Sequence, residues 1–218
     1  MRKNAREVGR PRGRPQLRPD GETRRLLIQA ADEEFRANGY ASSVMGAVAR
    51  RAGVSTKTLY RLIPTKAELF RNVVSERMGR FMLAIDPDAL DATTFPAALE
   101  RFLIAYGELM FAEQTIGMHR LVLGESQSFP ELAAAFYEEA IQGTAEAMVT
   151  WLSRQCSRGL IQLEDVQTAA GMLRGMMAME PQRAAMLGQR YTQMPEEIAA
   201  RAKYCARLFL NGCGGNNR

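Results

Sequence analysis

Closely spaced helix stops divide the N-terminal third of the sequence into short segments. Apolar side chains recur every fourth position over residues 24–38, as on one face of a helix, and Gly39 is a typical residue for ending it. A second helix is expected over residues 43–52, with Gly53 as its stop, and a third over residues 56–63. Helices this short are stable only when they pack against one another. The sequence therefore predicts a small all-α domain here.

The second and third of these helices, joined by the tight turn at Gly53, have the pattern of a helix-turn-helix. Pro64 ends the third helix, and Thr65 with Glu68 forms a capping box that opens a fourth, longer helix. In a helix-turn-helix, the first residues of the second helix of the pair project into the major groove of DNA. Double-stranded DNA is therefore the expected partner.

Hydroxyl and basic side chains gather around the third helix. Ser55 is expected to cap it, which leaves Thr56 and Lys57 at its tip, within reach of base edges. Thr58 and Tyr60 follow as hydrogen-bond donors for phosphates. The simpler alternative is a solvated face without a ligand, and only the combination of these residues favours DNA.

Lys66 adds an electrostatic argument. It stands in the first turn of the fourth helix, where the positive end of the helix dipole disfavours a cation unless an anion lies beside it. A DNA phosphate would be that anion. Lys66 is therefore predicted to contact the DNA backbone.

The run AADEEFRANGYASSVMGAVARRAGVSTKTLYRLIPTKAELF, residues 30–70, resembles the N-terminal domain of TetR/AcrR-type transcriptional regulators, and the resemblance covers residues 24–75. It implies a homodimer whose two recognition helices bind a palindromic operator. It also implies base contacts from Thr56, Lys57 and Arg61, and phosphate contacts from Thr58, Tyr60 and Lys66.

Three positions depart from the family pattern. Glu34 stands where the family usually buries a leucine, Val44 replaces the usual Ser or Thr at the head of the second helix, and Gly46 weakens the first turn of that helix. Ser43 is expected to cap the second helix in place of Val44, which would shift a phosphate contact by one residue.

The first 19 residues carry the basicity of the chain. Seven Lys and Arg side chains against the single acid Glu7 give +6, whereas the whole chain is +5, so residues 20–218 are near −1. Residues 1–20 are predicted to form a disordered basic arm. Its segment GRPRGRP resembles an AT-hook, in which Arg12 and Arg14 would lie in the minor groove of A·T-rich DNA. A plain solubilising tail is the alternative.

The rest of the chain also has helical period. We expect the domain of residues 21–68 to be followed by a helical effector-binding and dimerisation domain at residues 69–211 and a flexible tail at 212–218. Its expected helices lie at residues 97–112, 114–125, 130–157, 164–180, 182–188 and 195–210, with Pro181 splitting or kinking a helix. The stretch RLVLGESQSFPELAAAFYEEA resembles the effector domain of one TetR branch, but that resemblance does not name a ligand.

Two sets of side chains are assigned to the two tasks of such a domain, and ordinary core packing is the alternative for both. A homodimer contact is predicted for Leu173, Met176, Met177, Glu180, Ile198, Ala202, Cys205 and Phe209. An apolar ligand cavity, with Tyr106 and His119 as its polar groups, is predicted from Phe102, Tyr106, Met110, His119, Leu123, Phe136 and Met148.

Several classes of function find no support in the sequence. It contains no uninterrupted apolar run long enough for a membrane span, no secretory signal and no nucleophile elbow, metal-ligand spacing or phosphate-binding loop. The widely spaced Cys156, Cys205 and Cys213 suit reduced cytoplasmic thiols, and no cofactor is expected. The prediction is a cytoplasmic homodimeric repressor, not an enzyme, that a small-molecule inducer releases from its operator. The alternative is a constitutive or architectural DNA-binding protein without an inducer.

Overall fold

A computed structural model describes residues 18–189 and 194–213, and within them every regular element is helical, as predicted. The elements are α1 (Asp20–Ser42), α2 (Met45–Arg51), α3 (Thr56–Leu62), α4 (Lys66–Ala84), α5 (Pro87–Asp91), α6 (Phe95–Phe111), α7 (Glu113–Glu125), α8 (Pro130–Phe136), the π-helix η1 (Tyr137–Gln142), α9 (Gly143–Ser157), α10 (Val166–Met186) and α11 (Pro195–Cys213). In the described part of the chain, no helix is long and apolar enough to cross a membrane.

The helix stops predicted at Gly39 and Gly53 and the caps predicted at Ser55 and Thr65 are confirmed. Gly39 has φ +76° and breaks the regular geometry of α1, and Gly53 has φ +68° in the turn between α2 and α3. The hydroxyl of Ser55 accepts a hydrogen bond from the backbone N–H of Thr58 at 3.0 Å, and that of Thr65 accepts one from Glu68 at 3.0 Å. Local sequence signals therefore set the boundaries of α3 and α4.

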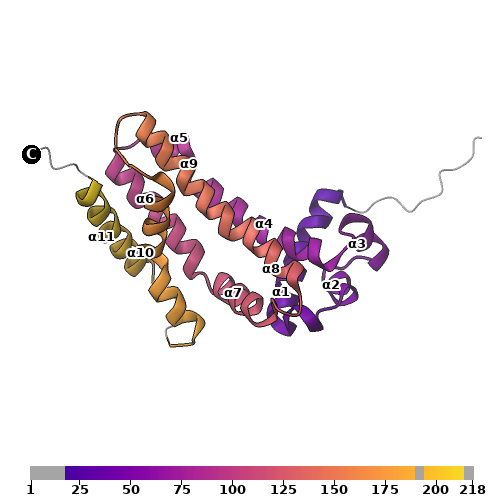
Figure 1. Cartoon of the computed structure of the whole chain (residues 1–218). Coiled ribbons are helices and arrows are strands. Elements are labelled where there is room, and N and C mark those ends of the chain that lie inside the picture. The colour runs from indigo at the N-terminus through magenta and orange to yellow at the C-terminus, as the bar shows by residue number, and fades with distance from the viewer. Residues whose placement is uncertain (1–17, 190–193, 214–218) are drawn as a thin grey trace, which may run out of the picture.

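The molecule is elongated, with α2 and α3 at one end, α10 and α11 at the other, and α4 running between them (Figure 1). The core under α1–α3 is not built from those helices alone. Met118 and Val122 of α7 and Leu132 and Phe136 of α8 are buried in the same cluster as Phe35 and its neighbours. The helix-turn-helix is thus packed directly onto the helices that follow it.

A second apolar core lies among α4, α6, α9, α10 and α11. Phe102 is completely buried in it, 5.1 Å from the Trp151 ring and 6.0 Å from that of Phe81 between centroids. Prolines stand in the first turn of α5, α6 and α8, where a missing N–H is tolerated. The short α5 was not anticipated, and the expected helix over residues 130–157 contains the π-turn η1.

Of the two outcomes expected at Pro181, a split and a kink, the split is wrong, because α10 continues through the proline to Met186. The kink stays a prediction. Proline lacks the N–H that would bond to the carbonyl of Met177, four residues earlier. Arg201 of α11 supplies the missing donor: its Nε lies 2.7 Å from the Met177 oxygen, and its Nη2 lies 2.8 Å from the Met176 oxygen. A neighbouring helix therefore satisfies the backbone group that the proline leaves free.

Replacing Arg201 by Met should lower the free energy of unfolding by about 1–3 kcal/mol, because a buried carbonyl loses its donor. Urea denaturation measures the loss. Lys203→Met, an exposed change on the same helix, is the control and should leave stability within about 0.5 kcal/mol. Equal stability of the two variants would contradict the role given to Arg201.

Candidate DNA-binding surface and ligand cavity

Helix α3 is amphipathic, with one buried face and one exposed face. Leu59 and Leu62 are buried beneath it, whereas Thr56, Lys57 and Tyr60 are exposed, Tyr60 by 51%. Apolar anchors thus fix the helix while its opposite face is left open to solvent. The side chains predicted to reach bases and phosphates share this face, and their contacts with DNA stay a prediction.

Arg61 is exposed on the same helix but already has a partner. Its Nη1 and Nη2 donate to the two oxygens of Asp20 at 2.9 and 2.7 Å. This paired hydrogen bond raises the pKa of the Arg61 guanidinium. Asp20, at the start of α1, thus competes with DNA for Arg61.

Thr58 is partly buried. Its hydroxyl lies 2.9 Å from that of Ser55, and its backbone N–H donates to the same Ser55 hydroxyl, which caps α3. The Ser55–Thr58 pair therefore forms the N-terminal end of α3. Either hydroxyl still has an unused lone pair or proton for a phosphate.

Lys66, assigned to a phosphate, has partners within the chain, and its contact with DNA stays a prediction. Its Nζ donates to the carbonyl oxygens of Tyr40, Ala41 and Ser43 at 2.6, 3.2 and 2.9 Å and lies 4.6 Å from the centre of the Tyr40 ring. An ammonium has three protons, and these three carbonyls account for them. In the chain by itself, the negative partner that the helix dipole argument required is thus the carbonyl-rich end of α1.

The same turn of α1 is held from its other side by Glu125, the last residue of α7. The carboxylate accepts the backbone N–H of Tyr40 at 2.8 Å and that of Ala41 at 2.6 Å. Burial raises the pKa of the Tyr40 phenol to about 12, with Glu131 and Glu125 contributing, and burial lowers the pKa of Lys66. We call Lys66, Glu125 and the backbone of residues 39–43 the junction clamp.

The prediction that Ser43 caps α2 is wrong. Ser43 is buried, and its hydroxyl donates to the Gly39 and Glu34 carbonyls at 2.5 and 3.2 Å, so it neither caps α2 nor faces solvent. Helix α2 begins at Met45 without a side-chain cap.

The unusual Glu34 is buried and bonded to Asn38 at 2.9 Å and to Arg51 at 3.2 Å, which ties α1 to α2. Arg12 and Arg14 lie outside the described residues.

Four of the side chains predicted for a ligand line one cavity of about 100 Å³ between α4, α6, α7, α8 and α10: Tyr106, Met110, His119 and Phe136. His119 bonds through Nδ1 to the Thr115 carbonyl at 2.9 Å and packs edge-on against Phe136. Burial lowers the pKa of His119, so the ring is neutral at pH 7. Tyr106 supplies a phenol whose pKa burial raises.

The other three predicted cavity residues lie elsewhere. Phe102 and Met148 are packed into the second core. Leu123 is 68% exposed and lines a separate surface groove between α7 and α8. The sequence missed three polar residues of the cavity, Arg77, Arg174 and Gln182. Each is a polar residue within an amphipathic helix, where the sequence alone favours solvent exposure.

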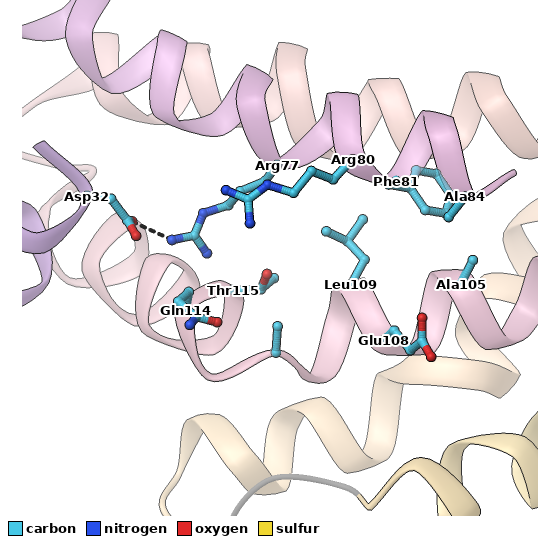
Figure 2. A pocket seen from close by; sticks show the side chains of 11 residues that line it. Asp32, Arg77, Arg80, Phe81, Ala84, Ala105, Glu108, Leu109, Gln114 and Thr115 are labelled. Carbon is cyan, nitrogen blue, oxygen red and sulfur yellow. Dashed lines mark hydrogen bonds and ion pairs between the residues drawn. The ribbon is translucent and has the colours of Figure 1, made fainter. Parts of the chain in front are cut away.

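A second hollow of about 290 Å³ opens beside this cavity and shares Arg77, Leu109 and Thr115 with it. Figure 2 shows Arg77 and Arg80 of α4 pointing into it, with Asp32 of α1 facing Arg77. We call it the vestibule. It lies at the meeting of α1, α4, α6 and α7.

The predicted dimer residues of α10 and α11 are mostly corrected. The chain's own second core already buries six of them: Leu173, Met177, Ile198, Ala202, Cys205 and Phe209. Met176 is partly buried against that core, and Glu180 is exposed. The apolar side chains that these two helices leave in solvent are Met172, Met179, Tyr204 and Leu208. They lie one or a few positions along the helices from the residues predicted for the homodimer contact.

The fold and the open face of α3 define a helix-turn-helix regulator. The model of the bacterial regulatory proteins of the TetR family matches residues 27–73, and that of the C-terminal domain of AefR-like transcriptional repressors matches residues 97–212, more than half of the 218 residues. The chain belongs to the TetR family.

One solved structure and two curated proteins agree with this placement. A TetR-family transcriptional regulator from Mesorhizobium loti superposes with a TM-score of 0.77 at 26% identity, over 88% of this chain and 97% of its own. The fatty acid metabolism regulator protein of Bacillus subtilis is 25% identical over 92 residues, 42% of this chain and 47% of its own length. The transcriptional activator FasR of Mycolicibacterium smegmatis is 29% identical over 141 residues, 62% of this chain and 61% of its own length. The chain thus spans about half to three-fifths of these two regulators, and all three are named as regulators, not enzymes.

Replacing Lys66 by Met should lower the free energy of unfolding by about 1–3 kcal/mol, since carbonyls at the end of α1 lose a charged donor. Chemical denaturation without DNA checks this. Lys57→Met is the matched control, because Lys57 is exposed and has no such bonds, and it should not change stability. A Lys66 variant of normal stability that loses only DNA affinity would restore the phosphate assignment.

Proposed function

We propose that the protein is a homodimeric repressor that binds a palindromic operator through α3 and releases it when a small molecule occupies the cavity. The observation that carries this proposal is the two-sided α3, anchored by Leu59 and Leu62 and open at Thr56, Lys57 and Tyr60. The match to AefR-like repressors supports repression over activation. Such a regulator would act in the cytoplasm, where its cysteines would be reduced.

On the proposed operator, Lys57 contacts a base edge from the tip of α3, and Thr56 lies beside it in the major groove. Arg61 joins them after leaving Asp20. Tyr60 and the Ser55–Thr58 pair contact phosphates at the edge of the groove. In a dimer the two α3 helices would contact half-sites separated by ~34–36 Å, one turn of DNA.

The proposed dimer contact uses the exposed apolar face of α10 and α11, made of Met172, Met179, Tyr204 and Leu208. Arg207 lies over the Tyr204 ring, 5.1 Å from its centre, at the edge of this face. Two such pairs of helices would pack as a four-helix contact. Burial of these side chains would remove from water the apolar surface that the single chain leaves open.

Operator binding tests the α3 assignment directly. An operator is first selected from a random DNA pool, and its affinity is then measured by fluorescence anisotropy. Lys57→Ala should weaken binding about tenfold or more and relax specificity at one base step, because a bidentate base contact is lost. Lys203→Ala, an exposed change far from α3, is the control. Unchanged affinity and footprint for Lys57→Ala would refute the docking.

The dimer is tested by Leu208→Glu, which should convert dimer to monomer in analytical ultracentrifugation while leaving the helical content unchanged. Leu208 is 46% exposed, so the charge is accommodated in the monomer but not in a contact. Phe209→Glu is the contrast: Phe209 is buried, and the charge should instead lower stability. A Leu208→Glu protein that stays dimeric would move the contact to another face.

A further inference from the structure

The cavity of about 100 Å³, which we call the inner cavity, has an excess of positive charge in its lining. Among residues 18–189 and 194–213, those that line it include two guanidinium groups, of Arg77 and Arg174, and no carboxylate. The remaining polar groups, among them Tyr106 and Gln182, are neutral. A low-dielectric cavity lined by cations alone favours a negatively charged occupant.

Arg174, on α10, carries the strongest sign of a missing partner. Its Nε is buried, and no acceptor among the described residues lies within hydrogen-bond distance of it. Nearly all buried polar atoms in native proteins have a partner, so an orphaned guanidinium N–H beside a cavity calls for one from outside the chain. The Gln182 amide, which also lines the cavity, donates to the Met110 carbonyl at 3.3 Å and so does not compete for such an acceptor.

Arg77, on α4, is held differently. Its side chain is 15% exposed, and it forms an ion pair with Asp32 of α1, drawn as the dashed line in Figure 2. Burial lowers the pKa of the Arg77 guanidinium, whereas Asp32 opposes this shift. Because Arg77 lines both the vestibule and the inner cavity, it stands between Asp32 on one side and the cavity on the other.

We propose that the cavity binds an amphipathic organic acid, whose acid group bonds to Arg174 and draws Arg77 away from Asp32. The proposal rests on the proposed function, because it names the class of the inducer and the contact that the inducer breaks. The anion gives Arg174 its missing acceptor and offers Arg77 a second carboxylate. The apolar part of the acid lies against Met110, Met118 and Phe136, which line the same space.

A cavity of about 100 Å³ accommodates the acid group and a few carbons. A longer chain has two ways out. The vestibule adjoins at Arg77, Leu109 and Thr115, and an apolar groove of about 550 Å³ adjoins at His119, Phe136 and Ile141. That groove is lined almost entirely by apolar atoms along α7 and α8, so the hydrocarbon end of the acid is placed there.

The consequence for DNA binding follows from where Asp32 lies. Asp32 belongs to α1, which packs on α2 and α3 and starts with the Asp20 partner of Arg61. Loss of the Arg77–Asp32 ion pair removes the polar contact between α1 and the middle of α4, while the apolar packing of the two helices remains. The acid would therefore change the position of α3 by competing for one arginine, in line with its differential affinity for the two states.

The test uses the purified full chain and straight-chain carboxylates from butanoate to dodecanoate, each paired with the amide of the same length. Isothermal titration calorimetry should give one carboxylate that binds at least about tenfold more tightly than its amide, because the hydrogen bonds to arginine are charge-assisted. Arg174→Met should lose that preference, and Arg174→Lys should keep part of it. Arg101→Met, an exposed arginine on α6, is the control and should bind like the wild type.

Two further readouts separate ligand binding from structural effects. Asp32→Asn should bind the carboxylate several-fold more tightly and the operator more weakly without ligand, since Arg77 is already free. Arg174→Met should raise the melting temperature of the ligand-free protein by a few degrees, because a buried N–H group without an acceptor is removed. A structural role for Arg174 would lower it.

The proposal is overturned if the operator is bound normally but no carboxylate binds better than its amide, if Arg174→Met keeps the preference, or if Arg174→Met lowers the melting temperature. Absence of operator binding in the wild type would instead contradict the proposed function. The two failures are distinguishable because operator affinity is measured separately on the same preparation.

Discussion

The turn that ends α1 depends on two opposite charges brought to it from other helices. The Lys66 ammonium satisfies carbonyls that a helix end leaves without partners, and the Glu125 carboxylate satisfies the amides of Tyr40 and Ala41. Gly39 allows both, because its φ of +76° suits glycine and a Cβ there would lie 2.7 Å from a Glu125 oxygen. Without the junction clamp, the end of α1 would expose five backbone groups and lose its fixed direction.

The junction clamp and the ion pair of Arg77 connect the proposed DNA surface with the cavity through the same three helices. Helix α4 begins with Lys66 and carries Arg77 two turns or more further on. Helix α7 lines the cavity with Thr115 and His119 and ends with Glu125. Helix α1 receives both contacts and packs on α2 and α3. In the proposed mechanism, a change of the cavity wall would reach the helix-turn-helix through these two polar contacts.

Much of the N-terminal domain could be predicted because its signals are local. Gly39, Gly53, Ser55 and Thr65 act on backbone groups within a few residues, so their effect does not depend on the rest of the fold. Lys66 shows where such reasoning ends. The helix dipole argument correctly required a negative partner for Lys66. It does not distinguish a DNA phosphate from a carbonyl-rich helix end as that partner. Only the tertiary structure brings Tyr40 and Ser43 within 3 Å of the Lys66 Nζ.

The contacts of the C-terminal helices were harder to predict, because they too depend on the tertiary structure. Helical periodicity identifies an apolar stripe on α10 and α11, but it does not say whether the stripe faces the chain's own core or a second subunit. Phe209 and Leu208 differ by one position and have opposite surroundings, buried and half exposed. Pro181 stays within a helix because Arg201, twenty residues later and on another helix, bonds to the carbonyl it leaves free. Arg174 was overlooked because an arginine on a helix is usually solvated.

Hydrogen exchange at the amides of Tyr40 and Ala41 tests the coupling most directly, because these two N–H groups bond to Glu125 across the junction. Their exchange rates are measured in the free chain, in the operator complex, and after a compound has released the operator. Slow exchange on DNA followed by clearly faster exchange on release is the expected result. Identical rates in the bound and released states would show that the α1 turn is not involved in release.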